Sequence, residues 1–299
     1  MLNRRILRIK AFKAVYSLAE NPGASLKEIL SQLDRSCEAT RDLYLFILDL
    51  IPAVCAEARQ RAEAAMRKFK PTEEERNPNL RFINNSIAAL LNEDPDFQKI
   101  ISKKKMSWDQ YDVLLRHIYD SVRASGYYAR YMELPEAGRT EDAAVFADIL
   151  AAELPGNEEL RAILEDLDIW WNDDLEYAIN CAIDTLKSLG EGRSWDLPRL
   201  YSDGAESDEE FVKGIVTKAV AGFSKYWESI AEAAPKWDRD RICTTDLALI
   251  VCGASEHAAF PDMPTKVIIN EYVEISKFYS TPESRSFVNG LLDRLINKQ

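Results

Sequence analysis

Three arginines near the start of the chain, Arg4, Arg5 and Arg8, could together bind phosphate. On an α-helix that turns about 100° per residue, they fall within an arc of about 100° and so share one face. Residues 1–19 carry five basic side chains and no acidic one, so no carboxylate before Glu20 can pair with them locally. Guanidinium groups bind phosphate oxygens through paired hydrogen bonds. The pattern favours a phosphate-binding face, and a solvated helix face without a ligand is the alternative.

Residue patterns for catalysis or metal binding are scarce. The chain has two histidines, no glycine-rich phosphate loop and no Gly-x-Ser-x-Gly sequence. Its five cysteines are an odd number without a Cys-x-x-Cys pair, which predicts buried thiols in a reducing cytoplasm. We therefore predict a cytoplasmic protein that is not an enzyme and that needs no cofactor or metal.

The elements that carry these residues are predicted to be helices throughout. Proline and glycine are sparse and fall between segments with helical apolar spacing, and no run alternates long enough for a sheet. Gly290 interrupts the last predicted helix, which indicates close helix packing or the approach of a ligand. The fold class is all-α. Helices are predicted at about 3–20, 41–69, 107–133, 142–153, 157–167, 174–189 and 208–234, with two more after Pro264.

The net charge of −12 argues against nucleic-acid binding until its distribution is considered. Residues 1–35 carry seven basic side chains against three acidic ones, whereas residues 36–204 carry twenty against thirty-two. Affinity for RNA depends on local phosphate contacts, so a basic patch on an acidic protein can still bind it. A hydrophobic fraction of 46% allows a full core, and no apolar run is long enough to span a bilayer.

The end of the chain resembles a known family. Residues 270–277 begin with Asn270-Glu271 and end in Lys277, and residues 284–293 contain the sequence Phe-Val-Asn-Gly at 287–290. Both blocks are similar, in order and spacing, to the closing helices of the transcription antitermination factor NusB family. Residues 14–17, Ala-Val-Tyr-Ser, also resemble the family's first helix. The resemblance implies a compact all-α domain that binds RNA.

Several residues are candidates for RNA contact because they match positions of that family. The family uses an arginine-rich first helix to bind RNA, which implies this role for the three arginines. The two aromatic candidates are Tyr16 and Phe287, and each could stack on a base or could belong to the core. The family's basic residue before the phenylalanine is replaced here by Ser286. The RNA-binding candidates are Arg4, Arg5, Arg8, Tyr16, Lys266, Glu283, Ser284, Arg285, Phe287 and Asn289.

Two acidic residues are candidates for a protein partner. Asp246 and Glu256 match acidic positions on either side of the family's buried helix, near which the partner NusE, a small-subunit ribosomal protein, docks. The alternative for Asp246 is a role as a helix cap. The resemblance further implies binding of boxA-type RNA in nascent ribosomal transcripts and participation in an RNA polymerase antitermination complex.

The resemblance covers residues 1–35 and 205–299, and we interpret residues 36–204 as a helical insertion. Its apolar helices at 41–55 and 111–122 should be buried, and the segment should serve a protein partner or enlarge the core. Two other functions remain open. One is a helical protein–protein scaffold without RNA binding. The other is the NusB-like domain of an rRNA cytosine methyltransferase, which would need a catalytic domain after Gln299.

Overall fold

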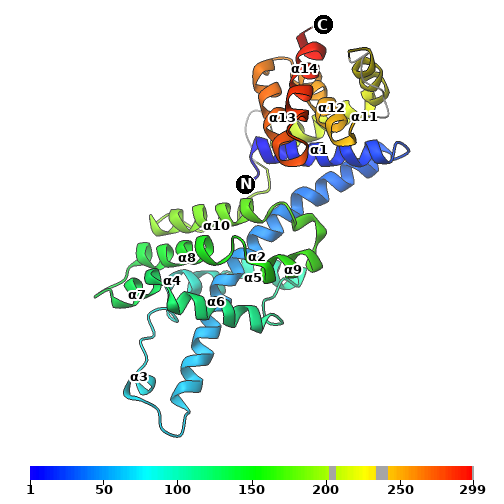
Figure 1. The fold of residues 1–299 in the computed structure, drawn as a ribbon. Helices are drawn as coiled ribbons and strands as arrows, with labels where there is room; N and C mark the ends of the chain where they lie inside the picture. Colours follow the sequence, from blue (N-terminus) through cyan, green and yellow to red (C-terminus); the bar gives the residue numbers. More distant parts are fainter. Residues whose placement is uncertain (202–206, 234–241, 298–299) are drawn as a thin grey trace. The chain divides into compact units, whose positions relative to one another are not determined.

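The computed structural model describes residues 1–201, 207–233 and 242–297 of the 299-residue chain. Every regular element in these ranges is helical (Figure 1), so the prediction of an all-α fold is confirmed. The elements are α1 (Arg4–Glu20), α2 (Leu26–Met66), α3 (Glu73–Arg76), α4 (Ser86–Glu93), α5 (Pro95–Lys104), α6 (Asp112–Ala124), α7 (Gly126–Glu133), α8 (Arg139–Glu153), α9 (Glu158–Leu167), the 3₁₀ helix η1 (Ile169–Trp171), α10 (Leu175–Gly190), α11 (Asp208–Ala233), α12 (Thr244–Ala259), α13 (Thr265–Tyr279) and α14 (Ser284–Asn297).

The chain divides into two compact units, which are described separately. Unit 1 consists of Met1–Glu38 and Arg199–Gln299, and unit 2 of Ala39–Pro198. Helix α2 contributes its first turns to unit 1 and the remainder to unit 2. The predicted domain limits at residues 35 and 204 stay predictions, and residue 204 lies outside the described residues.

Unit 1 is built around α12. Residues 247–256 of this helix are all buried, and α1, α11, α13 and α14 each pack against it. A helix that is apolar around most of its circumference is stable only when other elements enclose it. At Gly253 a Cβ atom would lie 2.6 Å from Cδ2 of Leu292 on α14, so glycine is needed for this close approach.

Unit 2 has its core along the later part of α2. Phe46 of α2 stacks on Trp108 with ring centroids 4.0 Å apart, and Trp108 Nε1 donates to the Phe46 carbonyl at 3.0 Å. Helices α8 and α10 pack closely, because a Cβ at Gly190 would lie 3.1 Å from Cβ of Ala143. Most apolar side chains of the predicted helices at 41–55 and 111–122 are buried within this unit, although Val113 is 49% exposed.

Helix limits agree with the predicted ones to within a few residues except in two segments. The helix predicted at 41–69 begins much earlier, at Leu26, because α2 runs from Leu26 to Met66. The predicted helix at 107–133 is two helices, α6 and α7, because Ser125 interrupts it. The Ser125 hydroxyl accepts a hydrogen bond from the Tyr128 backbone N–H and so caps the second helix. For the helix predicted at 208–234, the structure describes residues up to Ala233.

Two further sequence predictions can be compared with the structure. All five cysteines are free thiols, but Cys243 is exposed and Cys181 is half-buried, so the prediction of burial is wrong for these two. None of the described helices combines the length and apolar character needed to cross a bilayer.

Candidate nucleic-acid interface

Helix α1 carries the predicted arginines on unit 1. It begins at Arg4 because the Asn3 side chain accepts a hydrogen bond from the Ile6 backbone N–H at 3.0 Å. Its apolar side, including Leu7, Ala11 and Val15, is buried against the other helices of the unit. The three arginines lie beside this buried side, and each one reaches an acidic residue of another helix.

Arg8 forms a buried ion pair with Glu256 of α12. Its Nε lies 3.1 Å and 2.9 Å from the two carboxylate oxygens, and its Nη2 lies 2.6 Å from Oε1. The two side chains are 5% and 0% exposed, and the Tyr272 hydroxyl donates to the same carboxylate at 2.9 Å. Burial lowers the pKa of Arg8, but its hydrogen bond and ion pair with Glu256 raise that pKa more, so the guanidinium stays charged.

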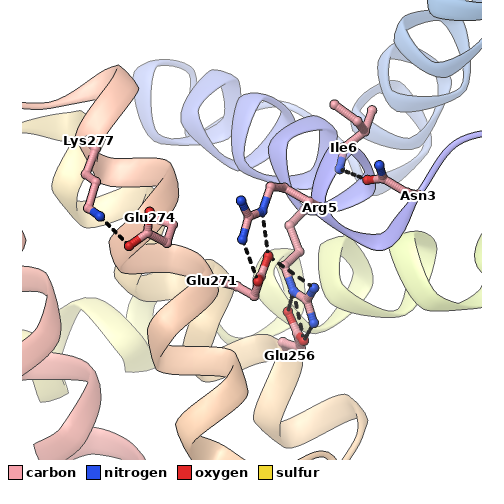
Figure 2. A network of polar contacts seen from close by, with 8 residues as sticks. Asn3, Arg5, Ile6, Glu256, Glu271, Glu274 and Lys277 are labelled. Carbon is pink, nitrogen blue, oxygen red and sulfur yellow. Dashed lines mark hydrogen bonds and ion pairs between the residues drawn. The ribbon is translucent and has the colours of Figure 1, made fainter. Parts of the chain in front are cut away.

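Arg5 pairs with Glu271 of α13 and remains accessible. Its Nε and Nη2 donate to the two carboxylate oxygens at 3.0 and 2.8 Å, as Figure 2 shows. The Arg5 side chain is 50% exposed, and that of Glu271 is 17% exposed. Hydrogen bonding from Arg5 lowers the pKa of Glu271, so this carboxylate is charged at neutral pH. Sequence reasoning did not assign Glu271 a site role, although it belongs to the Asn270-Glu271 pattern.

Arg4 pairs with Asp208 at the start of α11, with 3.1 Å between Arg4 Nε and Asp208 Oδ1. Its guanidinium carbon also lies 4.1 Å from the ring centroid of Phe211. The sequence argument assumed that the three arginines lack acidic partners, and this assumption is wrong because the partners come from α11, α12 and α13. Arg8 is 5% exposed and paired within unit 1, so its predicted RNA contact stays a prediction that the burial does not favour.

Further along α1, cationic and aromatic side chains meet the end of α13. The Tyr279 ring lies 5.2 Å from the Phe12 ring, and its centroid is 5.8 Å from the Lys13 ammonium. Tyr16 is 39% exposed, so it lies at the surface rather than in the core. We name the set Arg5, Lys13, Tyr16, Glu271 and Tyr279 the α1–α13 face.

The turn between α13 and α14 is fixed by Asp246 of α12. Ser280 Oγ donates to one of its carboxylate oxygens at 2.6 Å, and Ser284 Oγ donates to the other at 2.7 Å. Asp246 and Ser284 are 5% and 6% exposed, and Glu256 is fully buried. All three residues bond within unit 1, so the predicted RNA contact of Ser284 and the predicted partner contacts of Asp246 and Glu256 stay predictions that their burial does not favour. Asp246 holds the turn after α13 instead of capping its own helix.

The remaining predicted RNA contacts lie on α13 and around the start of α14. Lys266 is exposed in the first turn of α13. Glu283, Arg285 and Asn289 are exposed, and Phe287 is half-buried. Gly290 is exposed, and a Cβ added there would meet nothing within 4 Å. The prediction of close helix packing at Gly290 is therefore wrong; close packing occurs at Gly253, for which it was not predicted.

The fold and this arrangement define an all-α protein whose arginine-bearing first helix is joined by ion pairs to the helices near its C-terminal end. The NusB family matches residues 177–297, a region that begins in α10 and includes α11 to α14. The chain belongs to the NusB family.

Curated relatives named transcription antitermination protein NusB support this assignment. The one from Natranaerobius thermophilus is 33% identical over 89 residues, covering 30% of this chain and 64% of the relative. The one from Syntrophotalea carbinolica is 40% identical over 91 residues, covering 30% and 58%. The chain thus spans less than two thirds of these two relatives, whereas it covers 72% of the Finegoldia magna relative at 33% identity. No solved structure matches the chain.

Proposed function

We propose that this protein is a non-enzymatic, RNA-binding transcription antitermination factor. In this proposal it binds boxA-type RNA of nascent ribosomal transcripts together with NusE, within an RNA polymerase antitermination complex in the cytoplasm. Membership of the NusB family, whose matched relatives carry the antitermination name, supports the role. The α1–α13 face supports RNA as the ligand.

The observation that carries the RNA proposal is the bidentate contact of Arg5 with Glu271 at a half-exposed position. A guanidinium uses the same two parallel N–H donors to bind phosphate. An exposed ion pair contributes only about 0–1 kcal/mol to stability, so a phosphate can replace the carboxylate at little cost. Arg5 is therefore a cation that the fold positions without burying it.

The rest of the α1–α13 face has the composition of a site for single-stranded RNA. Lys13 supplies a second cation, and Tyr16 supplies an exposed ring on which a base can stack. On the helix Arg5 and Tyr16 point within about 20° of each other and stand about 16 Å apart along the axis. An extended strand can therefore contact both residues.

The proposed RNA-binding residues follow from these positions. We assign direct contact to Arg5, Lys13 and Tyr16 of α1 and to the exposed Lys266, Arg285 and Asn289, with Phe287 as a half-buried stacking candidate. Arg8 and Ser284 act by holding helices in place. The proposal of NusE as a partner rests on the family, since Asp246 and Glu256 are buried.

The test is binding of labelled boxA-type RNA to the full chain, with and without NusE and with a scrambled RNA as the comparison. Arg5→Ala should weaken binding and reduce the salt dependence by about one unit of slope. Arg116→Ala is the matched control, because Arg116 is an exposed, ion-paired arginine of unit 2. Absence of boxA binding by folded protein, with or without NusE, would favour the protein–protein scaffold instead.

A further inference from the structure

A second cationic and aromatic surface lies on unit 2, at the end of α2. The helix finishes at Met66 and is followed by Arg67, Lys68, Phe69 and Lys70. All four of these residues are exposed, and Phe69 is 96% exposed. Figure 1 shows this end of α2, and the segment that carries α3, extending beyond the other helices of unit 2. We name residues 67–70 the α2 tip.

The exposure of Phe69 has a physical cost. A phenylalanine side chain stabilises a fold when it is buried, and Phe69, at 96% exposed, contributes nothing in this way. Single exposed apolar residues are common. A ring with three cations among its immediate neighbours is a more specific arrangement, because cations and rings together bind nucleic acid.

A groove adjoins the α2 tip and is lined, like the tip, by cationic and aromatic side chains. It has a volume of about 480 Å³, and Lys68 of the tip is one of its lining residues. Arg61 and Arg123 add two more cations, and Tyr119 and Tyr128 add two rings. The Arg61 guanidinium carbon lies 5.2 Å from the Tyr119 ring centroid, and the two tyrosine rings are 6.4 Å apart and nearly perpendicular.

The cations of the tip and groove can exchange their present partners. Lys68 pairs with Glu75 and Arg67 with Glu63, and these two pairs are largely exposed. Arg61 pairs with the exposed Asp120 and keeps a second pair with the buried Glu57, so a phosphate would replace Asp120 alone. Exposed pairs contribute little to stability, so phosphate can replace them. Among the described residues, neither Lys70 nor Arg123 has a carboxylate within ion-pair distance.

We propose that the α2 tip and the adjoining groove form a binding site for single-stranded RNA, separate from the α1–α13 face. Phe69 and Tyr128 stack on bases, while Lys68, Lys70, Arg61 and Arg123 contact phosphates. The groove favours RNA over a lipid bilayer, because a flat surface would touch the tip alone. Glu74 and Glu75 also line the groove and repel any phosphate beside them, so the RNA phosphates would have to lie next to the cations instead.

The first experiment locates RNA on the full chain by ultraviolet crosslinking to a uridine-rich single strand, followed by digestion with trypsin. Residues 69–76 form one tryptic peptide, because a proline follows Lys70, and residues 14–27 form the peptide that carries Tyr16. Crosslinks should appear on peptide 69–76 and persist in Arg5→Ala. They should disappear in Phe69→Ala while those on peptide 14–27 remain.

The second experiment measures affinity by fluorescence anisotropy of the same RNA in the Arg5→Ala background. Phe69→Ala should weaken binding roughly 5-fold or more, and Phe69→Leu should weaken it nearly as much because leucine cannot stack. Lys70→Glu should weaken binding and reduce its salt dependence. Ile169→Ala is the matched control, since Ile169 is a 73% exposed apolar residue of unit 2 beside an acidic residue. All these variants should keep the wild-type melting temperature.

The two RNA sites can fail separately. Crosslinks confined to peptide 14–27 would overturn the α2 tip and leave the proposed function standing. Crosslinks on peptide 69–76 alone would support the α2 tip and overturn the α1–α13 face as an RNA site. Phe69→Ala that abolishes binding to phosphatidylserine vesicles, with RNA affinity unchanged, would identify a membrane contact and overturn the proposal. Full affinity in Phe69→Leu would also overturn it, because the contact would then be merely apolar.

Discussion

Removing either member of the buried pair between Arg8 and Glu256 should destabilise unit 1 far more than removing the exposed pair of Arg5. The Arg8 and Glu256 side chains are 5% and 0% exposed, so each deletion leaves a buried charge without its partner. Such a deletion typically costs about 3–5 kcal/mol. The exposed Arg5 pair should contribute no more than about 1 kcal/mol.

The contacts of each residue refine these magnitudes. In Glu256→Gln, Arg8 still has the Glu271 carboxylate, since Arg8 Nη1 lies 3.7 Å from Glu271 Oε2, so we expect about 3 kcal/mol. In Arg8→Ala, the Tyr272 hydroxyl is the one side-chain donor left to Glu256 among the described residues, so we expect the upper end, about 5 kcal/mol. The double variant Arg8→Met with Glu256→Gln removes both charges and should recover most of the loss.

Hydrogen exchange measured by mass spectrometry is the assay, because it reports on each unit separately. A loss of about 3 kcal/mol should accelerate exchange of the α12 amides by roughly 100-fold where they exchange through opening of unit 1. Amides of α8 in unit 2 serve as the internal control. Arg5→Ala should change α12 exchange by no more than about 5-fold.

Two results would refute this reasoning. One is an Arg8→Ala variant whose α12 amides exchange no faster than those of Arg5→Ala. The other is a double variant whose loss equals the sum of the two single losses, since uncoupled residues add. RNA affinity per folded molecule provides a separate check, because it should fall in Arg5→Ala and be retained in Arg8→Ala.

Three further predictions concern other positions. Gly290→Ala should stabilise α14 by about 0.5–1 kcal/mol, whereas Gly253→Ala should cost about 1–3 kcal/mol, and the opposite order in thermal melts would contradict the packing seen here. Phe287→Ala should weaken RNA binding by about 1–3 kcal/mol if the ring stacks on a base, while a loss of melting temperature with affinity preserved would make Phe287 a core residue. Burial and the nearby Asp109 raise the pKa of Asp49 to about 7, so the folded state holds a proton that the unfolded state has lost, and stability falls as pH rises from about 4 to about 7. Asp49→Asn removes this dependence, so its stability advantage over wild type in urea titrations should grow across that window.

The helices could be predicted because their determinants are local. Apolar spacing marked α1, α8, α9, α10 and α11 to within a few residues of their observed limits. The error in the 107–133 segment has a local cause as well. Ser125 lies within an apolar-periodic stretch, but its hydroxyl can cap a new helix, and this choice depends on how α6 and α7 pack.

The ion pairs could not be predicted from local sequence because their members are far apart. Arg8 and Glu256 are separated by 248 residues, and Arg5 and Glu271 by 266. One signal was nevertheless present. Glu256 lies one helical turn after the apolar run 247–252 of α12, and a buried carboxylate needs a partner that compensates its charge. An arginine without local partners is a suitable counterpart, so the two observations together point to Arg8 or its neighbours.

The two helical glycines, Gly253 and Gly290, also show that local sequence does not predict tertiary packing. Gly253 lies in α12 and Gly290 in α14, and glycine in a helix costs about 1 kcal/mol relative to alanine wherever it occurs. Only the structure distinguishes them, since Leu292 faces Gly253 and nothing lies within 4 Å of Gly290. Gly290 is thus the position where a ligand could approach the backbone closely.

The arginines of α1 show how a small rotation separates folding from binding. Arg8 points about 60° from Arg5 on the helix, and this difference places one guanidinium in the core and the other at the surface. The buried pair stabilises the folded unit, in which Arg5 and Tyr16 are exposed on one side of α1. Substituting all three arginines together would therefore remove the RNA contact of Arg5 and also destabilise the fold through Arg8. Single substitutions at Arg5 and Arg8 separate these two effects, because the first should change affinity and the second stability.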